Sequence, residues 1–179
     1  KIVIGGKTVL NFSSNDYLGL ANDCRLKEAA VEAIKRYGCG ATASRLLAGH
    51  LKLHEELETD LARMMDTETA LVFGSGFLTN LGVLTSLAGP GDHVFSDRLN
   101  HASLIDGIRL SSAHCDRFRH KDMVHLEELL KKSEDAAGKR IIVSESVFSM
   151  DGDIAPLEEI SQLAHKYHAL LIIDEAHAI

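Results

Sequence analysis

From about residue 70 onward, short apolar runs alternate with longer amphipathic stretches. Strands are expected at the apolar runs 70–73, 93–96, 113–118, 141–145 and 170–174. Apolar residues at helical spacing fill the intervals and predict helices over about 77–88, 102–110, 122–132 and 157–168. Strands that alternate with helices predict βαβ units. The expected fold class is therefore α/β, with a mainly parallel sheet flanked by helices.

The N-terminal part of the chain does not show this alternation. Two apolar runs on either side of Gly5-Gly6 predict a β-hairpin with a glycine turn within residues 1–12. Helices are expected over 25–37 and 51–65. We therefore expect a hairpin and helix segment over residues 1–40 and the larger α/β domain over residues 41–179.

Composition and charge narrow the class of protein. The chain is 45% hydrophobic and 25% charged, as is typical of globular domains. Its net charge of −7 argues against nucleic acid as the main partner. No apolar stretch approaches the roughly 18 residues of a membrane span. Cys24, Cys39 and Cys115 form no CxxC pair, which disfavours a disulfide framework or zinc site and favours the reducing cytoplasm.

Polar clusters follow three of the expected strands, at 74–76, 146–149 and 174–177. Ligands of parallel sheets bind beyond the carboxyl ends of the strands, so these clusters predict a shared site. Gly74-Ser75-Gly76 opens an expected helix, whose first amides could bind a phosphate. Alone this signal is weak, because glycine is also common in such turns for conformational reasons.

Asp174 ends an apolar strand, where a carboxylate is costly unless it has a partner. One suitable partner is the protonated ring nitrogen of a pyridine cofactor. The alternative is that Asp174 only caps the following loop. His177 could reach a neighbouring ring oxygen. His101 stands at an expected helix start, where it could stack on a flat cofactor or be an ordinary helix residue.

Two other patterns are weaker. Gly6-Lys7-Thr8 together with Asp-Glu-Ala-His at 174–177 suggests a helicase, but a phosphate-binding P-loop would need glycine at residue 1, which is lysine. His50 and His54 are four residues apart and could share a metal ion. The residues between them lack the glutamate of zinc-protease motifs, so a solvated helix face is favoured and no metal is expected.

A series of segments runs in order along the whole chain. The segments are Asn-Asp-Tyr-Leu-Gly-Leu at 15–20, the glycine-rich stretch 38–49, Leu-His-Glu-Glu-Leu-Glu at 53–58, Ser-Gly-Phe at 75–77, 97–104, 145–153 and Asp-Glu-Ala-His at 174–177. This series resembles the α-oxoamine synthases, which depend on pyridoxal 5′-phosphate (PLP). The resemblance implies the large domain of a fold type I PLP-dependent transferase.

The resemblance also implies a role for each matching residue. Ser75, Gly76 and Phe77 would help to hold PLP, and His101 would stack on its ring. Ser149 and His177 would contact the ring hydroxyl oxygen, and Asp174 would pair with the ring nitrogen. Asp174, His177 and His101 are thus the expected catalytic residues in this chain. Asn15 and His101 would approach the substrate. Glu145 is expected to be structural, and Arg45 has no assigned role.

The implied reaction is the decarboxylative condensation of an amino acid with an acyl thioester to an aminoketone. The preferred substrates are L-alanine and a pimeloyl thioester of CoA or an acyl carrier protein, with glycine and an acetyl thioester as the alternative. The expected assembly is a homodimer with shared active sites.

The family's cofactor-binding lysine has no counterpart here. It would follow the Asp-x-x-His motif, whereas the last lysine, Lys166, lies in the helix before Asp174. We therefore expect an incomplete chain, without the catalytic-lysine region and the C-terminal small domain, and inactive alone. A non-catalytic scaffold subunit is the alternative from a different class.

Overall fold

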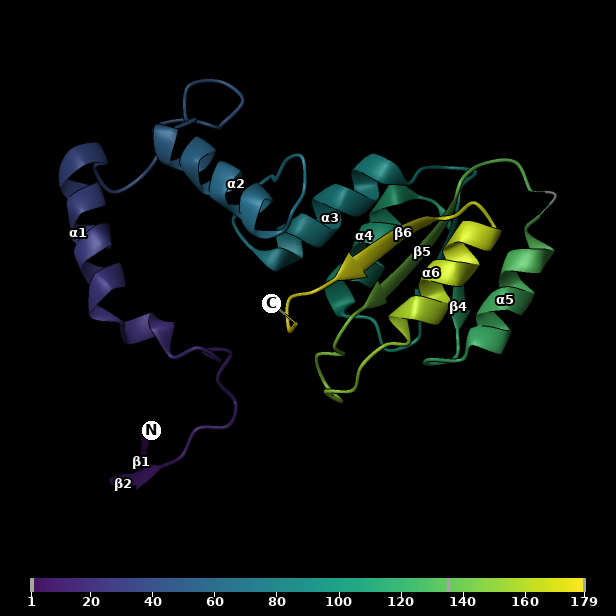
Figure 1. Ribbon diagram of the computed structural model, residues 1–179, viewed down its shortest axis with the longest axis horizontal. Coiled ribbons are helices and arrows are strands. Elements are labelled where there is room, and N and C mark those ends of the chain that lie inside the picture. The colour runs from purple at the N-terminus through teal and green to yellow at the C-terminus, as the bar shows by residue number, and fades with distance from the viewer. Residues whose placement is uncertain (1, 135, 179) are drawn as a thin grey trace. The chain divides into compact units, whose positions relative to one another are not determined.

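The computed structural model describes residues 2–134 and 136–178. Its contacts group the chain into two compact units, Lys1–Ala70 and Leu71–Ile179, and most of their elements are labelled in Figure 1. The domain division expected after residue 40 stays a prediction.

The first unit begins with the expected hairpin. Strand β1 (Ile2–Ile4) pairs antiparallel with β2 (Lys7–Val9). Gly5 and Gly6, with φ of 54° and 77°, form the turn in a backbone conformation that glycine adopts without steric cost. The glycine-turn hairpin is therefore confirmed for the described residues, and Lys1 lies outside them.

Helix α1 (Cys24–Tyr37) follows a short 3-10 turn, η1 (Leu20–Asn22). The Asp23 carboxylate caps α1 by accepting the Arg25 amide at 2.8 Å. Gly38, with φ of 84°, donates its amide to the Ile34 carbonyl and ends the helix. The expected helix is confirmed, but Leu26 and Ile34 on its apolar face are each 52% exposed.

Arg45 forms an ion pair with Glu58 within the first unit. Its two terminal nitrogens lie 2.7 and 2.8 Å from the carboxylate oxygens of Glu58 in helix α2 (Lys52–Met64). Two parallel hydrogen bonds between a guanidinium and a carboxylate fix the relative orientation of the two groups in addition to pairing their charges. The hydrogen bonds to Glu58 raise the pKa of Arg45. The irregular segment before α2 is thereby attached to the helix.

The two candidate metal-binding histidines do not share a helix face. His50 precedes α2 and accepts from Arg45 Nε at 3.3 Å. His54 lies inside α2, where its Nδ1 accepts the Leu51 amide at 3.0 Å and so caps the helix start. Both rings therefore have protein partners, and the expected solvated helix face is wrong for His50.

The second unit holds a four-stranded parallel sheet of order β4-β3-β5-β6. Its strands are β3 (His93–Asp97), β4 (His114–Phe118), β5 (Arg140–Glu145) and β6 (Leu170–Asp174). Each coincides with an expected strand to within one residue at either end. The α/β class and the parallel sheet are confirmed.

The strand expected at 70–73 is wrong. This run is irregular, and among the described strands none pairs with it. Phe73 instead packs on a helix, because a Cβ on Gly82 would meet its ring at 2.7 Å. An apolar run becomes a strand only where a neighbouring strand forms hydrogen bonds with its backbone N–H and C=O groups. The apolar content of the run does not show whether such a neighbour is present.

Helices cover both faces of the sheet (Figure 1). Helices α3 (Gly76–Leu87) and α4 (Ala102–Ser111) lie on one side, and α5 (Met123–Lys132) and α6 (Leu157–Lys166) lie on the other. Successive side chains of β5 lie on opposite faces of the sheet. Ile141 and Val143 pack with α3 and α4, whereas Ile142 packs with α5 and α6. Strands covered on both faces explain the continuous apolar runs.

Helices α3 and α4 cross closely at Gly107. A Cβ there would meet Leu84 Cδ1 at 2.8 Å and the Asn80 carbonyl oxygen at 3.0 Å. Gly107→Ala is therefore expected to lower the free energy of unfolding by about 1–3 kcal/mol through overpacking. Urea unfolding measures this, with Gly89→Ala as the control because a Cβ at Gly89 meets nothing within 4 Å. Equal midpoints for the two variants would contradict the close crossing.

Cys24, Cys39 and Cys115 are free and exposed. The expectation that the chain has no disulfide framework stays a prediction. No helix within 2–134 or 136–178 is long and apolar enough to cross a membrane.

Candidate active site

The centre of the sheet forms a topological switch point. Strands β3 and β5 are neighbours, but the chain leaves β3 for α4 on one face and leaves β5 for α6 on the other. The crevice beyond the carboxyl ends of two such strands is the usual ligand site of an open α/β sheet. The loops after β3, β5 and β6 carry His101, Ser149 and His177, respectively.

One cavity at this edge collects most of the expected site residues. It is lined by Gly76, Phe77, Asn80, His101, Ser103, Glu145, Ser149, Asp174, Ala176 and His177. Six of these were expected from the sequence, and they come from four separate segments of the second unit. Their assignment to a cofactor stays a prediction. Asn15 lies in the first unit, so its approach to the substrate stays a prediction too.

The N-terminus of α3 opens toward this cavity. Ser75 caps the helix, because its hydroxyl accepts the Leu78 amide at 3.2 Å. The first amides of a helix have no partner within it, so Gly76 and Phe77 present N–H groups at the positive end of the helix dipole. Gly76 has no Cβ to crowd these groups. This end of the cavity is suited to an anion.

Asp174 ends β6 and pairs in register with Glu145 of β5. One carboxylate oxygen of Asp174 accepts the Asn80 side-chain amide at 2.7 Å. The other accepts the Ala176 amide at 2.9 Å, which is the loop-capping contact considered from the sequence. Both contacts fix the carboxylate at the cavity wall, so capping and ligand binding are compatible.

Asn80 also starts a hydrogen-bond chain to His101. Its Nδ2 donates to Ser103 Oγ at 2.8 Å, and Ser103 Oγ lies 2.6 Å from His101 Nδ1. The Ser103 amide donates to the same Nδ1 at 3.2 Å, so this nitrogen is an acceptor. With Nδ1 accepting this amide, Nε2 is the ring nitrogen left to contact a ligand. The chain couples the orientation of His101 to that of Asp174.

Glu145 joins two of the expected cofactor residues. It is only 2% exposed, and its two carboxylate oxygens accept the His101 amide at 2.6 Å and the Ser149 amide at 3.0 Å. One buried carboxylate thus fixes the loops after β3 and β5 relative to each other. The expected structural role agrees with these contacts.

Asn100 anchors the loop before His101. It is buried, and its Nδ2 donates to Ser96 Oγ at 2.9 Å and to the Val143 carbonyl at 2.8 Å. The loop after β3 is therefore attached to β5 through two independent side chains, Asn100 and Glu145.

Asn80, Ser103 and Asn100 were not expected from the sequence as site residues. Asn80 lies four residues after Gly76, hence on the same helix face, and this spacing could have identified it. Ser103 offered no such signal, because its contact with Asn80 depends on the close crossing at Gly107.

A His–His–Asp group lies at the opposite ends of the strands. His93 Nδ1 and His114 Nε2 lie 3.5 and 3.3 Å from the two Asp116 carboxylate oxygens. The carboxylate thus faces both rings, and the expectation that the chain holds no metal stays a prediction.

Comparison with known proteins identifies the family. The profile of the aminotransferase class I and II family matches residues 7–179. The chain is 52% identical over 178 residues to an 8-amino-7-oxononanoate synthase from Lysinibacillus sphaericus. The aligned residues make up 99% of this chain and 46% of that protein. It therefore spans about half the length of the curated relatives it matches.

Solved structures agree with this comparison. A serine palmitoyltransferase from S. paucimobilis with a bound PLP–myriocin aldimine has a TM-score of 0.94 and 36% identity, over 99% of this chain and 46% of its own. An 8-amino-7-oxononanoate synthase from Francisella tularensis has a TM-score of 0.75 and 31% identity, over 92% of this chain and 44% of its own. Both are α-oxoamine synthases, so the resemblance and the fold type I large domain are confirmed. The chain belongs to the aminotransferase class I and II family.

Proposed function

We propose that the whole protein is a PLP-dependent α-oxoamine synthase of biotin synthesis, an 8-amino-7-oxononanoate synthase. The observation that carries the proposal is the cavity in which Asp174, His101 and the start of α3 meet at the switch point of the sheet. The 52% identity to a synthase of that name supports the choice within the family.

The chemistry of the cavity fits PLP group by group. The amides of Gly76 and Phe77 suit its phosphate, and the Asp174 carboxylate suits its protonated ring nitrogen. Ser149 and His177 would serve its ring oxygen, and the His101 ring would pack on its flat face. When bound, PLP supplies a ring that withdraws electrons from the α-carbon of an attached amino acid.

The residues of the chain would do the positioning. Asn80 holds one Asp174 oxygen and, through Ser103, fixes the Nδ1 side of the His101 ring. Asp174 would keep a proton at the ring nitrogen, because a nearby carboxylate favours the protonated, positively charged form of a basic nitrogen. Glu145 would keep His101 and Ser149 on the same cavity wall.

The proposed substrates are L-alanine and a pimeloyl thioester. Serine with a palmitoyl thioester is the second candidate, because the serine palmitoyltransferase structure superposes with a TM-score of 0.94. Glycine with an acetyl thioester, the reaction of 2-amino-3-ketobutyrate CoA ligase, is the third. The test assays the full-length protein with PLP and every pairing of these three amino acids and three thioesters, and follows thiol release. Alanine with the pimeloyl thioester is expected to give the highest kcat/KM, by about tenfold or more.

A labelling experiment, read together with that assay, distinguishes an enzyme from a scaffold subunit. PLP is added to the full-length protein, reduced with borohydride, and the adduct is mapped. An enzyme should show one stoichiometric lysine adduct and turn over at least one substrate pair. Absence of both results would overturn the proposal in favour of the scaffold.

A cytoplasmic homodimer with shared active sites is part of the proposal. The free thiols of Cys24, Cys39 and Cys115 support a reducing compartment. The exposed apolar side chains of α1, Leu26, Val31 and Ile34, support a surface that a partner covers. Light scattering of the full-length protein should give the mass of two chains.

A further inference from the structure

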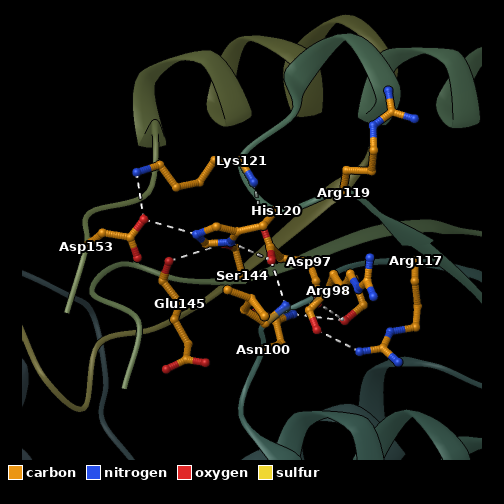
Figure 2. Close-up of polar contacts among 12 residues, drawn as sticks. Asp97, Arg98, Asn100, Arg117, Arg119, His120, Lys121, Ser144, Glu145 and Asp153 are labelled. Atoms are coloured by element: carbon orange, nitrogen blue, oxygen red, sulfur yellow. Dashed lines mark hydrogen bonds and ion pairs between the residues drawn. The ribbon is translucent and has the colours of Figure 1, made fainter. Parts of the chain in front are cut away.

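His120 lies between two carboxylates at the carboxyl ends of the strands (Figure 2). Its Nδ1 is 2.9 Å from Asp97 Oδ1, and its Nε2 is 3.0 Å from Asp153 Oδ2. Asp97 ends β3 and its side chain is 1% exposed. Asp153 belongs to the loop 146–155, which follows β5 and carries Ser149. The imidazole therefore connects two segments that flank the candidate active site.

The geometry requires a protonated ring. A carboxylate only accepts hydrogen bonds, and a neutral imidazole has one donor, so two such contacts need both nitrogens to carry protons. Burial of the ring opposes its charge, but the hydrogen bonds and charges of Asp97 and Asp153 outweigh it and raise the pKa of His120. Lys121 and His120 together lower the pKa of Asp153.

Other contacts strengthen the same connection. Lys121 Nζ lies 2.8 Å from Asp153 Oδ2, and the Lys121 amide donates to Asp97 Oδ2 at 3.0 Å. The His120 ring also meets the buried Phe148 ring edge-on, with 4.4 Å between centroids. His120 thus contacts the loop at Phe148 and at Asp153, on both sides of Ser149.

The loop transmits these contacts to Ser149. The Phe148 amide donates to the Asp153 carbonyl at 3.0 Å, and the Gly152 amide donates to the Phe148 carbonyl at 2.8 Å. These bonds close a tight turn around Ser149, whose amide is held by Glu145 at 3.0 Å. Displacement of Asp153 would open this turn next to the cavity.

We propose that protonated His120 is a positioning residue, which clamps the loop 146–155 to the end of β3 and so holds Ser149 in the candidate active site. The clamp is a property of the chain itself. Only its effect on PLP rests on the proposed function.

The clamp depends on pH in a defined direction. The charged groups that face His120 are Asp97, Asp153 and Lys121. Because the folded pKa of His120 is raised, its stabilisation is fully present below the ordinary value of 6.5 and is lost as pH rises through the folded pKa. Asp97 is the more buried carboxylate and should keep the remaining N–H, so the contact to Asp153 should break.

Hydrogen exchange of the full-length protein without cofactor tests the clamp. Wild type, His120→Gln, Asp153→Asn and His165→Gln are compared at one pH below 6.5. His165 is the control because it is exposed in the last turn of α6. Amides 147–153 should exchange about tenfold faster in His120→Gln and Asp153→Asn, the factor expected for one lost hydrogen bond to a charged group. Amides of α6 should not change.

PLP titration of the same proteins gives the functional readout. Wild-type affinity should fall as pH rises through the His120 titration, whereas His120→Gln should be weaker and lack this transition. Unchanged exchange of 147–153 in both variants would overturn the clamp. If His120→Gln does not fold, Asp153→Asn, at a half-exposed position, decides alone. If the loop responds but wild type binds no PLP at any pH, the clamp stands and the proposed function fails.

Discussion

Asp174→Asn is expected to reduce the turnover number of the full-length protein by about 10²–10³-fold, the loss typical of one removed electrostatic contact in an active site. The side chain keeps its size and one carbonyl oxygen, which can still accept from Asn80 as the carboxylate does at 2.7 Å. What it loses is the acceptor of the Ala176 amide and the negative charge that would hold a proton on the PLP ring nitrogen. The fold should therefore survive while the chemical step does not.

Steady-state kinetics and thermal unfolding, measured on the same samples, separate these effects. Asp151→Asn is the matched control, because Asp151 is exposed in the loop 146–155 and does not line the cavity. It should leave turnover and melting temperature near those of wild type. Turnover of Asp174→Asn within a few-fold of wild type would show that Asp174 only caps its loop.

Glu145→Ala is expected to lower the free energy of unfolding by about 2–4 kcal/mol. The carboxylate is 2% exposed and accepts the His101 and Ser149 amides, so its removal leaves two N–H groups without an acceptor. The loops after β3 and β5 would then separate, and PLP affinity should fall with stability. Glu145→Gln, which keeps one acceptor oxygen, should lie between alanine and wild type.

Urea unfolding and PLP titration provide the measurements for Glu145. Glu159→Ala is the control, because Glu159 is an exposed glutamate on α6. Its effect should stay within about 0.5 kcal/mol, as is usual for surface substitutions. If Glu145→Ala and Glu159→Ala unfold at the same urea concentration, Glu145 does not join the two loops.

Much of the site could be predicted from the sequence because it follows from topology. The carboxyl ends of parallel strands share one edge, so polar clusters after separate strands had to meet there. His101, Ser149 and Asp174 do line one cavity. Their positions along the chain were sufficient to predict that they meet, since each lies at or shortly after the end of a strand with a strong apolar pattern.

The rest depends on contacts that no local pattern encodes. The run 70–73 has the composition of a strand but packs through Phe73 on Gly82. The fork of Arg45 on Glu58 and the bridge of His120 between Asp97 and Asp153 join residues far apart in sequence. A sequence shows which groups are available for such contacts, but only the packed structure selects the partners.

We propose that Asp174 faces the protonated ring nitrogen of bound PLP. The most direct measurement is the ¹⁵N chemical shift of ring-labelled PLP bound to the full-length protein at neutral pH. The wild type should show a protonated pyridine nitrogen, and Asp174→Asn should move the shift toward the neutral value. A neutral ring nitrogen in the wild type, or the same shift in both proteins, would contradict the claim.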